Sequence, residues 1–266
     1  MARRTSTLVH AVLLLAVVAA VALPLAAAQP WATCGTGGTG TYEQGSEYES
    51  NLQSIALSLR DQASRSWILF STSSLGAAPN TVYGLLQCRG DVSQSACAEC
   101  GTRVRSDAGP ACRRTRDVAL VYDECYARLS DSDAFLANKE GPGLETRLVS
   151  GTNISSADVA GYNRAVTELL TATVQYAVVD DTSRKMFATG RRVGTDPGFS
   201  NIYSTAQCAF DITLESCRRC LEGLVAGWWD MFPRNAEGAR VASDRCHLRS
   251  EVAPFYNGEP MVLLHE

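Results

Sequence analysis

The chain has 266 residues, and its 24 Lys and Arg are outnumbered by 28 Asp and Glu, which gives a formal net charge of −4. Arg3 and Arg4 precede a long apolar stretch that ends in the small residues Ala26 to Ala28. This pattern predicts a cleaved signal peptide over residues 1–28. A signal anchor is the alternative, because the apolar stretch is almost long enough to span a bilayer.

The chain after residue 28 has 22 basic and 28 acidic residues, because Arg3 and Arg4 account for two of the 24 basic ones. This acidic balance argues against nucleic acid as a partner. No later apolar segment approaches the ~18 residues that a membrane helix needs, so we expect no membrane span. We therefore expect a secreted, extracellular protein in an oxidising compartment, where its ten cysteines can form five disulfide bonds.

The first elements after the signal peptide alternate between helix and strand patterns. Apolar residues at Tyr48, Leu52, Ile55, Ala56 and Leu59 have the spacing of one helix face. A strand is predicted within residues 66–73, a helix at 95–108 and further strands within 117–130. The order is typical of an α+β fold in which a small antiparallel sheet packs against two helices.

The same pattern then occurs a second time. Residues 83–100 and 203–220 both read Tyr-x3-Gln-Cys-x8-Cys-x2-Cys, and a further cysteine follows each, at Cys125 and Cys246. Tyr162 repeats the helical pattern of Tyr48, 114 positions later, and strands are predicted within 184–190 and 239–252. The repeat predicts two tandem domains.

The polar stretch 130–143 contains a Gly-Pro-Gly turn and separates the two copies. We expect a first domain at 29–135, a linker at 136–150, a second domain at 151–258 and a C-terminal tail at 259–266.

Each C-x-x-C has three chemical interpretations: half of a zinc site, a redox dithiol, or part of a disulfide framework. Zinc is disfavoured because only His247 and His265 remain after the signal peptide, neither at finger spacing. A redox centre is disfavoured because a third and a fourth cysteine accompany each pair. We therefore expect structural disulfides, no metal and no cofactor.

The motif C-x8-C-x2-C, together with "VYGLLQCRGD" (82–91) and "GARVASDRC" (238–246), resembles the ginkbilobin-homologous (Gnk2, DUF26), or stress-antifungal, family of plant cysteine-rich repeat proteins. The resemblance extends from Cys34 to about Tyr256 and implies two ginkbilobin-like domains. It also implies five disulfide pairs: Cys34–Cys112, Cys88–Cys97, Cys100–Cys125, Cys208–Cys217 and Cys220–Cys246. The second copy lacks the pair that corresponds to Cys34–Cys112, and Phe232 and Pro233 stand near the place of its second cysteine.

The resemblance also implies a sugar site, made in the family by an Asn near the domain start, an Arg six residues before the last cysteine and a Glu five residues after it. The first domain has Gly35, Ala119 and Ser130 at these positions, so we expect no sugar site of this kind there. The second domain has Arg240 and Glu251, which could grip sugar hydroxyls by charge-assisted hydrogen bonds.

The third sugar ligand of the second domain is less clear. Asn153 is the nearest candidate, but it also begins the glycosylation sequon "NIS" (153–155), and a glycosylated amide could not serve as ligand. The alternative role of Arg240 and Glu251 is a surface ion pair. Eleven residues apart, they would face opposite sides of one regular strand, so a shared site requires a bend between them. Trp228 and Trp229 could offer a stacking surface for a sugar, or belong to the core.

No catalytic motif is present, and Asp180, Asp181 and Asp230 have no distinctive context for a glycosidase pair, so we expect no enzyme. The favoured function is apoplastic recognition of mannose-type glycans of fungal cell walls in plant defence. The alternative is an interaction module that binds receptor ectodomains, related repeat proteins or a second copy of the chain, without sugar binding.

Overall fold

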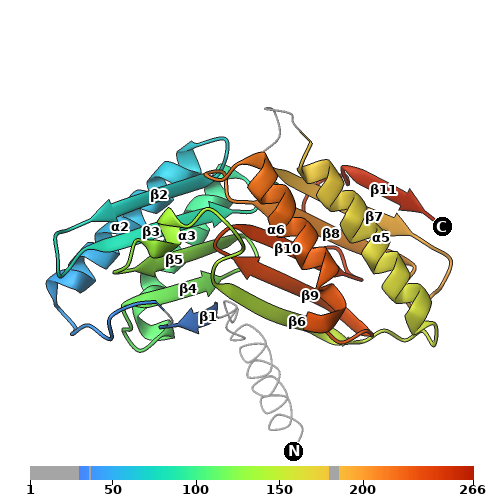
Figure 1. Cartoon of the computed structure of the whole chain (residues 1–266), viewed down its shortest axis with the longest axis horizontal. Coiled ribbons are helices and arrows are strands. Elements are labelled where there is room, and N and C mark those ends of the chain that lie inside the picture. Colours follow the sequence, from blue (N-terminus) through green and yellow to red (C-terminus); the bar gives the residue numbers. More distant parts are fainter. Residues whose placement is uncertain (1–29, 36, 180–185) are drawn as a thin grey trace, which may run out of the picture.

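The computed structural model describes residues 30–35, 37–179 and 186–266, so the expected signal peptide lies outside the described residues. The first domain is an α+β unit (Figure 1) whose elements are, in chain order, β1 (Trp31–Cys34), α2 (Glu47–Arg65), β2 (Phe70–Leu75), β3 (Val82–Cys88), α3 (Gln94–Ala111), β4 (Asp117–Val121) and β5 (Cys125–Ser130). A short helix, α4 (Ala134–Ala137), leads to the second domain.

The second domain repeats this order, again with two long helices and a sheet. Its elements are β6 (Glu145–Asn153), α5 (Val159–Ala177), β7 (Phe187–Val193), β8 (Asn201–Cys208), α6 (Leu214–Ala226), α7 (Trp228–Met231), β9 (Ala236–Ser243), β10 (Cys246–Glu251) and β11 (Val262–His265). The predicted fold class, two tandem α+β domains, is confirmed.

The helix that carries each C-x-x-C begins at a hydroxyl residue of the motif. Ser93 caps α3 and accepts a hydrogen bond from the backbone N–H of Ala96 at 3.1 Å, and Thr213 caps α6 in the same way through Ser216, also at 3.1 Å. Such caps satisfy backbone donors that the first helical turn leaves free. They start both helices at the same point relative to the cysteines, which aligns the two copies.

The strand order is β1-β4-β5-β3-β2 in the first sheet and β11-β7-β8-β10-β9-β6 in the second. Two segments differ from the expected domain limits. Residues 145–150, which lie within the expected linker, form the first part of the edge strand β6 and pair with β9. Within the expected C-terminal tail, β11 pairs in parallel with β7.

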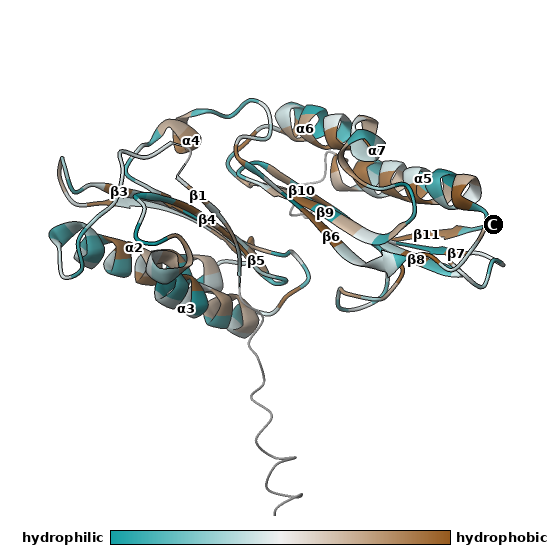
Figure 2. Cartoon of the chain, turned by 90° about the horizontal axis from the view of Figure 1, so that it is seen from below, coloured by the Kyte–Doolittle hydropathy of each residue, from teal (hydrophilic) through white to brown (hydrophobic). Residues whose placement is uncertain are grey.

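The two domains pack through the helix-free faces of their sheets, so their helices lie on opposite outer sides of the molecule (Figure 2). A hydrophobic cluster fills this junction and draws on both domains and on the segment between them. Its buried members are Phe70, Leu85, Ala119, Val121, Tyr126, Phe135, Ala209 and Ala242. Each domain also has its own core between sheet and helices.

Five disulfide bonds join the same pairs that the resemblance implies: Cys34–Cys112, Cys88–Cys97, Cys100–Cys125, Cys208–Cys217 and Cys220–Cys246. The two cysteines of each C-x-x-C therefore bond to different partners. In the second domain, which has no counterpart of Cys34–Cys112, Phe232 is buried and its ring centroid lies 4.7 Å from that of Trp228.

Candidate ligand site at the domain junction

The glutamine of the repeated motif links the two domains reciprocally. Gln87 of the first copy donates to the carbonyl oxygen of Cys208 at 2.6 Å, and Gln207 of the second donates to that of Cys88 at 3.0 Å. Both side chains are buried. Buried polar groups need such partners, because a missing hydrogen bond costs about 1–3 kcal/mol. The sequence repeat thus contains a residue whose partner lies in the other domain.

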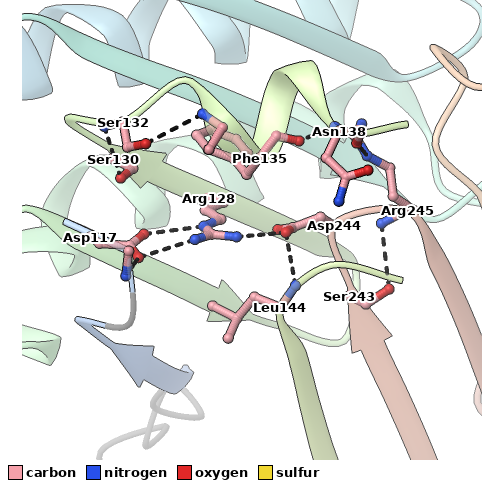
Figure 3. A network of polar contacts seen from close by, with 12 residues as sticks. Asp117, Arg128, Ser130, Ser132, Phe135, Asn138, Leu144, Ser243, Asp244 and Arg245 are labelled. Carbon is pink, nitrogen blue, oxygen red and sulfur yellow. Dashed lines mark hydrogen bonds and ion pairs between the residues drawn. The ribbon is translucent and has the colours of Figure 1, made fainter. Parts of the chain in front are cut away.

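A second reciprocal contact involves the aspartate two residues before the last cysteine of each copy. In the second domain this is Asp244, which accepts a hydrogen bond from Arg128 at 2.6 Å (Figure 3). Asp244 also accepts one from the Tyr126 hydroxyl at 2.8 Å. In the first domain it is Asp123, which accepts from Arg249 at 3.0 Å. Burial and the Asp244 carboxylate together raise the pKa of Tyr126 well above its ordinary value.

The first domain has an internal ion pair beside the positions at which the resemblance implies sugar ligands. Asp117 is completely buried and accepts two hydrogen bonds from Arg128, at 3.0 and 3.1 Å (Figure 3). Asp117 pairs across the sheet with Ser130, and Ala119 pairs with Arg128. Ala119 and Ser130 therefore lie on the face that the second domain covers, within the junction.

In the second domain the carboxylate lies on the other strand of the corresponding pair. Gly238 replaces the aspartate, and Glu251 stands opposite it on β10. The side chain of Glu251 fills the space above Gly238: a Cβ atom there would lie 1.6 Å from the carboxylate. The Glu251 carboxylate accepts hydrogen bonds from Arg249 at 2.8 Å and from Ser150 at 2.6 Å. Arg128 and Arg249, each three residues after the last cysteine of its repeat, thus both bond to a carboxylate. In the first domain it comes from Asp117 on β4, and in the second from Glu251 on β10, the counterpart of β5.

Arg240 is a functional candidate that contacts the first domain directly. The residue is 92% buried, its Nη1 atom donates to the carbonyl oxygen of Tyr122 at 3.1 Å, and its guanidinium lies 4.8 Å from the ring centroid of Trp31. It faces Arg249 directly across β9 and β10. Burial, and secondly the charge of Arg249, lower the pKa of Arg240 to about 10. The Nη2 atom of Arg240 is buried and has no hydrogen-bond partner.

A small cavity of about 50 Å³ lies beside Arg240 at the junction. Its lining includes Arg89 and Tyr122 of the first domain and Arg249 and His247 of the second. His247 is within 3.2 Å of the Gln87 side-chain oxygen, and its ring packs against that of Tyr126. Burial, with a smaller contribution from Arg240, lowers the pKa of His247 to about 3, so the imidazole is neutral at pH 7.

The hairpin between β9 and β10 brings two of the three predicted sugar ligands to one face. Arg240 pairs with Arg249, and Glu251 with Gly238, so Arg240 and Glu251 lie in adjacent strands, two register positions apart. The turn supplies the bend that one regular strand would lack. Asn153 pairs with Ala236 at the end of β6 and is exposed, and among the described residues no hydrogen bond joins it to Arg240 or Glu251.

Ser150 is a candidate site residue that sequence reasoning missed. In the first domain Cys34 pairs with Val118, seven residues before the last cysteine. In the second domain Val149 pairs with Ala239, again seven residues before the last cysteine, so Ser150 occupies the position after the missing cysteine. The first helices of the two copies are 114 residues apart. The same offset applied to Gly35 gives position 149, one residue from Ser150.

The other candidates lie elsewhere. Trp228 belongs to the core between helices and sheet, and Trp229 donates to the Thr167 hydroxyl at 2.9 Å, so neither faces the junction. Asp230 is in α7, whereas Asp180 and Asp181 lie outside the described residues. In the described part of the chain, no group of His, Cys, Asp and Glu could hold a metal ion. No described helix is long and apolar enough to cross a membrane.

The fold defines a tandem, disulfide-bonded α+β module whose two repeats pack face to face. Comparison with known families assigns residues 33–132 and 150–253 to the salt stress response/antifungal family. The chain belongs to this family, with two tandem domains, as the sequence resemblance predicted.

Two kinds of curated relatives match. The chain is 34% identical to cysteine-rich receptor-like protein kinase 6 of Oryza sativa over 91% of its own length, but spans only about a third (35%) of that protein. It is 31% identical to cysteine-rich repeat secretory protein 38 of Arabidopsis thaliana, covering 81% of each chain. The name of this secretory relative denotes no enzyme.

Among solved structures, the tandem DUF26 ectodomain of the cysteine-rich receptor-like protein PDLP8 of Arabidopsis thaliana is similar, with a TM-score of 0.63. The similarity covers 83% of this chain and 96% of the other at 19% sequence identity. At this identity the comparison shows the fold alone, which is that of a tandem ectodomain.

Proposed function

We propose that the chain is a secreted recognition protein of the plant apoplast, active in defence or stress responses, whose two domains act as one body and bind another protein. The observation that carries this proposal is that Arg240 and Glu251 are buried and already bonded within the chain. Each is 92% buried, and each is already bonded by groups of the same chain. A free sugar would have to displace these bonds, whereas a protein partner needs only the outer surface. The proposal assigns no catalysis.

The exposed aromatic pair of Trp67 and Phe210 supports protein recognition. Trp67 belongs to the first domain and Phe210 to the second, and their ring centroids are 6.0 Å apart. They are 53% and 38% exposed, respectively. Aromatic side chains are enriched in protein interfaces, where they often contribute most of the binding energy. This pair exists only when the two domains are packed together.

The test is binding to purified tandem ectodomains of receptor-like relatives, measured by biolayer interferometry. We expect wild type to bind at least one of them and Trp67→Ala to bind it at least tenfold more weakly. Leu263→Ala, which removes an exposed apolar side chain of β11, is the matched control and should bind like wild type. Sedimentation of the chain alone shows whether a second copy is itself the partner. The proposal is wrong if no ectodomain and no second copy binds, or if Trp67→Ala binds as tightly as wild type.

A second candidate function is recognition of mannose-type glycans of fungal cell walls. It is favoured by the arrangement of Ser150, Arg240 and Glu251, which occupy in the second domain the three positions that the resemblance assigns to sugar ligands. A glycan array probed with wild type and Arg240→Ala separates the two functions. A mannose-type signal that Arg240→Ala abolishes would support the glycan, and a signal that is absent or unchanged would exclude this candidate.

A further inference from the structure

The cavity at the junction is lined by an excess of positive charge. Three arginines, Arg89, Arg240 and Arg249, line it together with one carboxylate, Asp123, while His247 is neutral. At about 50 Å³ it is far smaller than an ordinary small-molecule pocket of ~300–1,000 Å³. It has room for about three or four water molecules, or for a chemical group of three or four heavy atoms.

The three arginines differ in how completely they are neutralised. Arg89 forms two hydrogen bonds with Asp91, at 2.5 and 3.0 Å. Arg249 bonds to both Glu251 and Asp123. Arg240 has only a 3.4 Å contact with the half-exposed Asp123, which it shares with Arg249. Arg240 therefore carries the least compensated charge at the cavity.

Arg240 is also incompletely bonded within the chain. Its Nη2 atom is buried without a partner, although a buried donor left unsatisfied is costly. The lowered pKa of Arg240 has the same origin, since burial and the facing Arg249 both disfavour its charge. A negatively charged group in the cavity would offset the repulsion between Arg240 and Arg249, which both line it.

We infer that the junction cavity binds a small free carboxylate at the guanidinium of Arg240. A guanidinium forms its strongest hydrogen bonds with carboxylates, and these bonds are charge-assisted. The cavity holds a group of three heavy atoms, which suits a carboxylate better than the five of a phosphate. The site contains side chains from both domains, so it exists only in the tandem arrangement. It is independent of the outer surface through which we propose that the protein recognises its partner.

Isothermal titration calorimetry of the full secreted chain at constant ionic strength tests the inference. The probes are acetate and acetamide, which has the same size and shape but no charge. We expect acetate to bind wild type and acetamide not to bind. Arg240→Gln should weaken binding of acetate at least tenfold. Arg191→Gln, whose guanidinium bonds to Asn201 away from the cavity, should change it less than twofold.

A second measurement keeps the inference testable if Arg240→Gln does not fold. In wild type, the NMR signals of the Arg240 side-chain nitrogens should shift on addition of acetate, and those of Arg191 should not. Absence of acetate binding, equal binding by Arg240→Gln, or unmoved Arg240 signals would each overturn the inference. Equal binding of acetate and acetamide would also overturn it, because the negative charge would then not be what the site recognises. None of these results bears on binding to receptor ectodomains.

Discussion

Replacing Asp244 by alanine should destabilise the protein strongly, whereas the same change at its counterpart Asp123 should not. Asp244 is almost completely buried and accepts hydrogen bonds from Arg128, from the Tyr126 hydroxyl and from the Leu144 backbone N–H at 2.9 Å. Breaking a buried ion pair by removing one partner costs about 3–5 kcal/mol. Arg128 retains a second carboxylate, but two further donors lose their acceptor, so we expect a loss of about 4 kcal/mol.

The matched substitution Asp123→Ala tests the same position of the repeat in an exposed setting. The Asp123 side chain is 50% exposed, so water can replace it, and we expect a loss of at most about 1 kcal/mol. At about 2–4 °C per kcal/mol, calorimetry under non-reducing conditions should show Asp244→Ala melting about 8–16 °C below wild type. Equal losses for the two variants would refute the reasoning, since burial at the junction would then not decide the strength of these contacts.

Three further outcomes are expected. Because the pKa of His247 is lowered to about 3, only the unfolded chain takes up a proton there as the pH falls through ~6.5, so the free energy of unfolding should drop by about 2 kcal/mol from pH 7 to pH 5. His247→Gln should lack this drop in urea titrations, and an unchanged pH dependence in the variant would contradict the neutral imidazole. Asn153→Gln should lose the mass of one glycan when the protein is secreted from plant cells, and equal masses would count against glycosylation. Reduction should raise the intact mass by ten hydrogens, since the described cysteines include no free thiol, and any thiol labelled before reduction would contradict the five-disulfide framework.

The scaffold was predictable because its signals are local and occur twice. The spacing of the cysteines and the apolar stripes of the first helices define the two units without any knowledge of how they pack. The strands β6 and β11 were not predicted. Residues 145–150 lie at a sheet edge, and their two apolar residues, Leu148 and Val149, are adjacent, so they lack the alternation that identifies a half-buried strand. The strand β11 has only four residues.

The environment of the candidate site was not predictable in the same way. The sequence places Arg240 and Glu251 at defined distances from Cys246, but it does not reveal that the helix-free face carrying Arg240 is covered by the other domain. The alternative role, a surface ion pair between Arg240 and Glu251, does not describe their contacts either. Arg240 bonds to Tyr122 of the first domain, and Glu251 bonds to Ser150. Both contacts depend on packing between segments about 100 or more residues apart.

The reciprocal bonds of Gln87 and Gln207 give the molecule the geometry of a two-fold dimer within one chain. In an isologous interface, residue i of one subunit meets residue j of the other and the reverse also holds. Gene duplication with fusion would hold such a pair together at a fixed ratio and without any dependence on concentration. It would also restrict later divergence, because a change at the glutamine of one repeat leaves a buried carbonyl of the other without its donor. At these positions the unit on which selection acts is the pair of repeats.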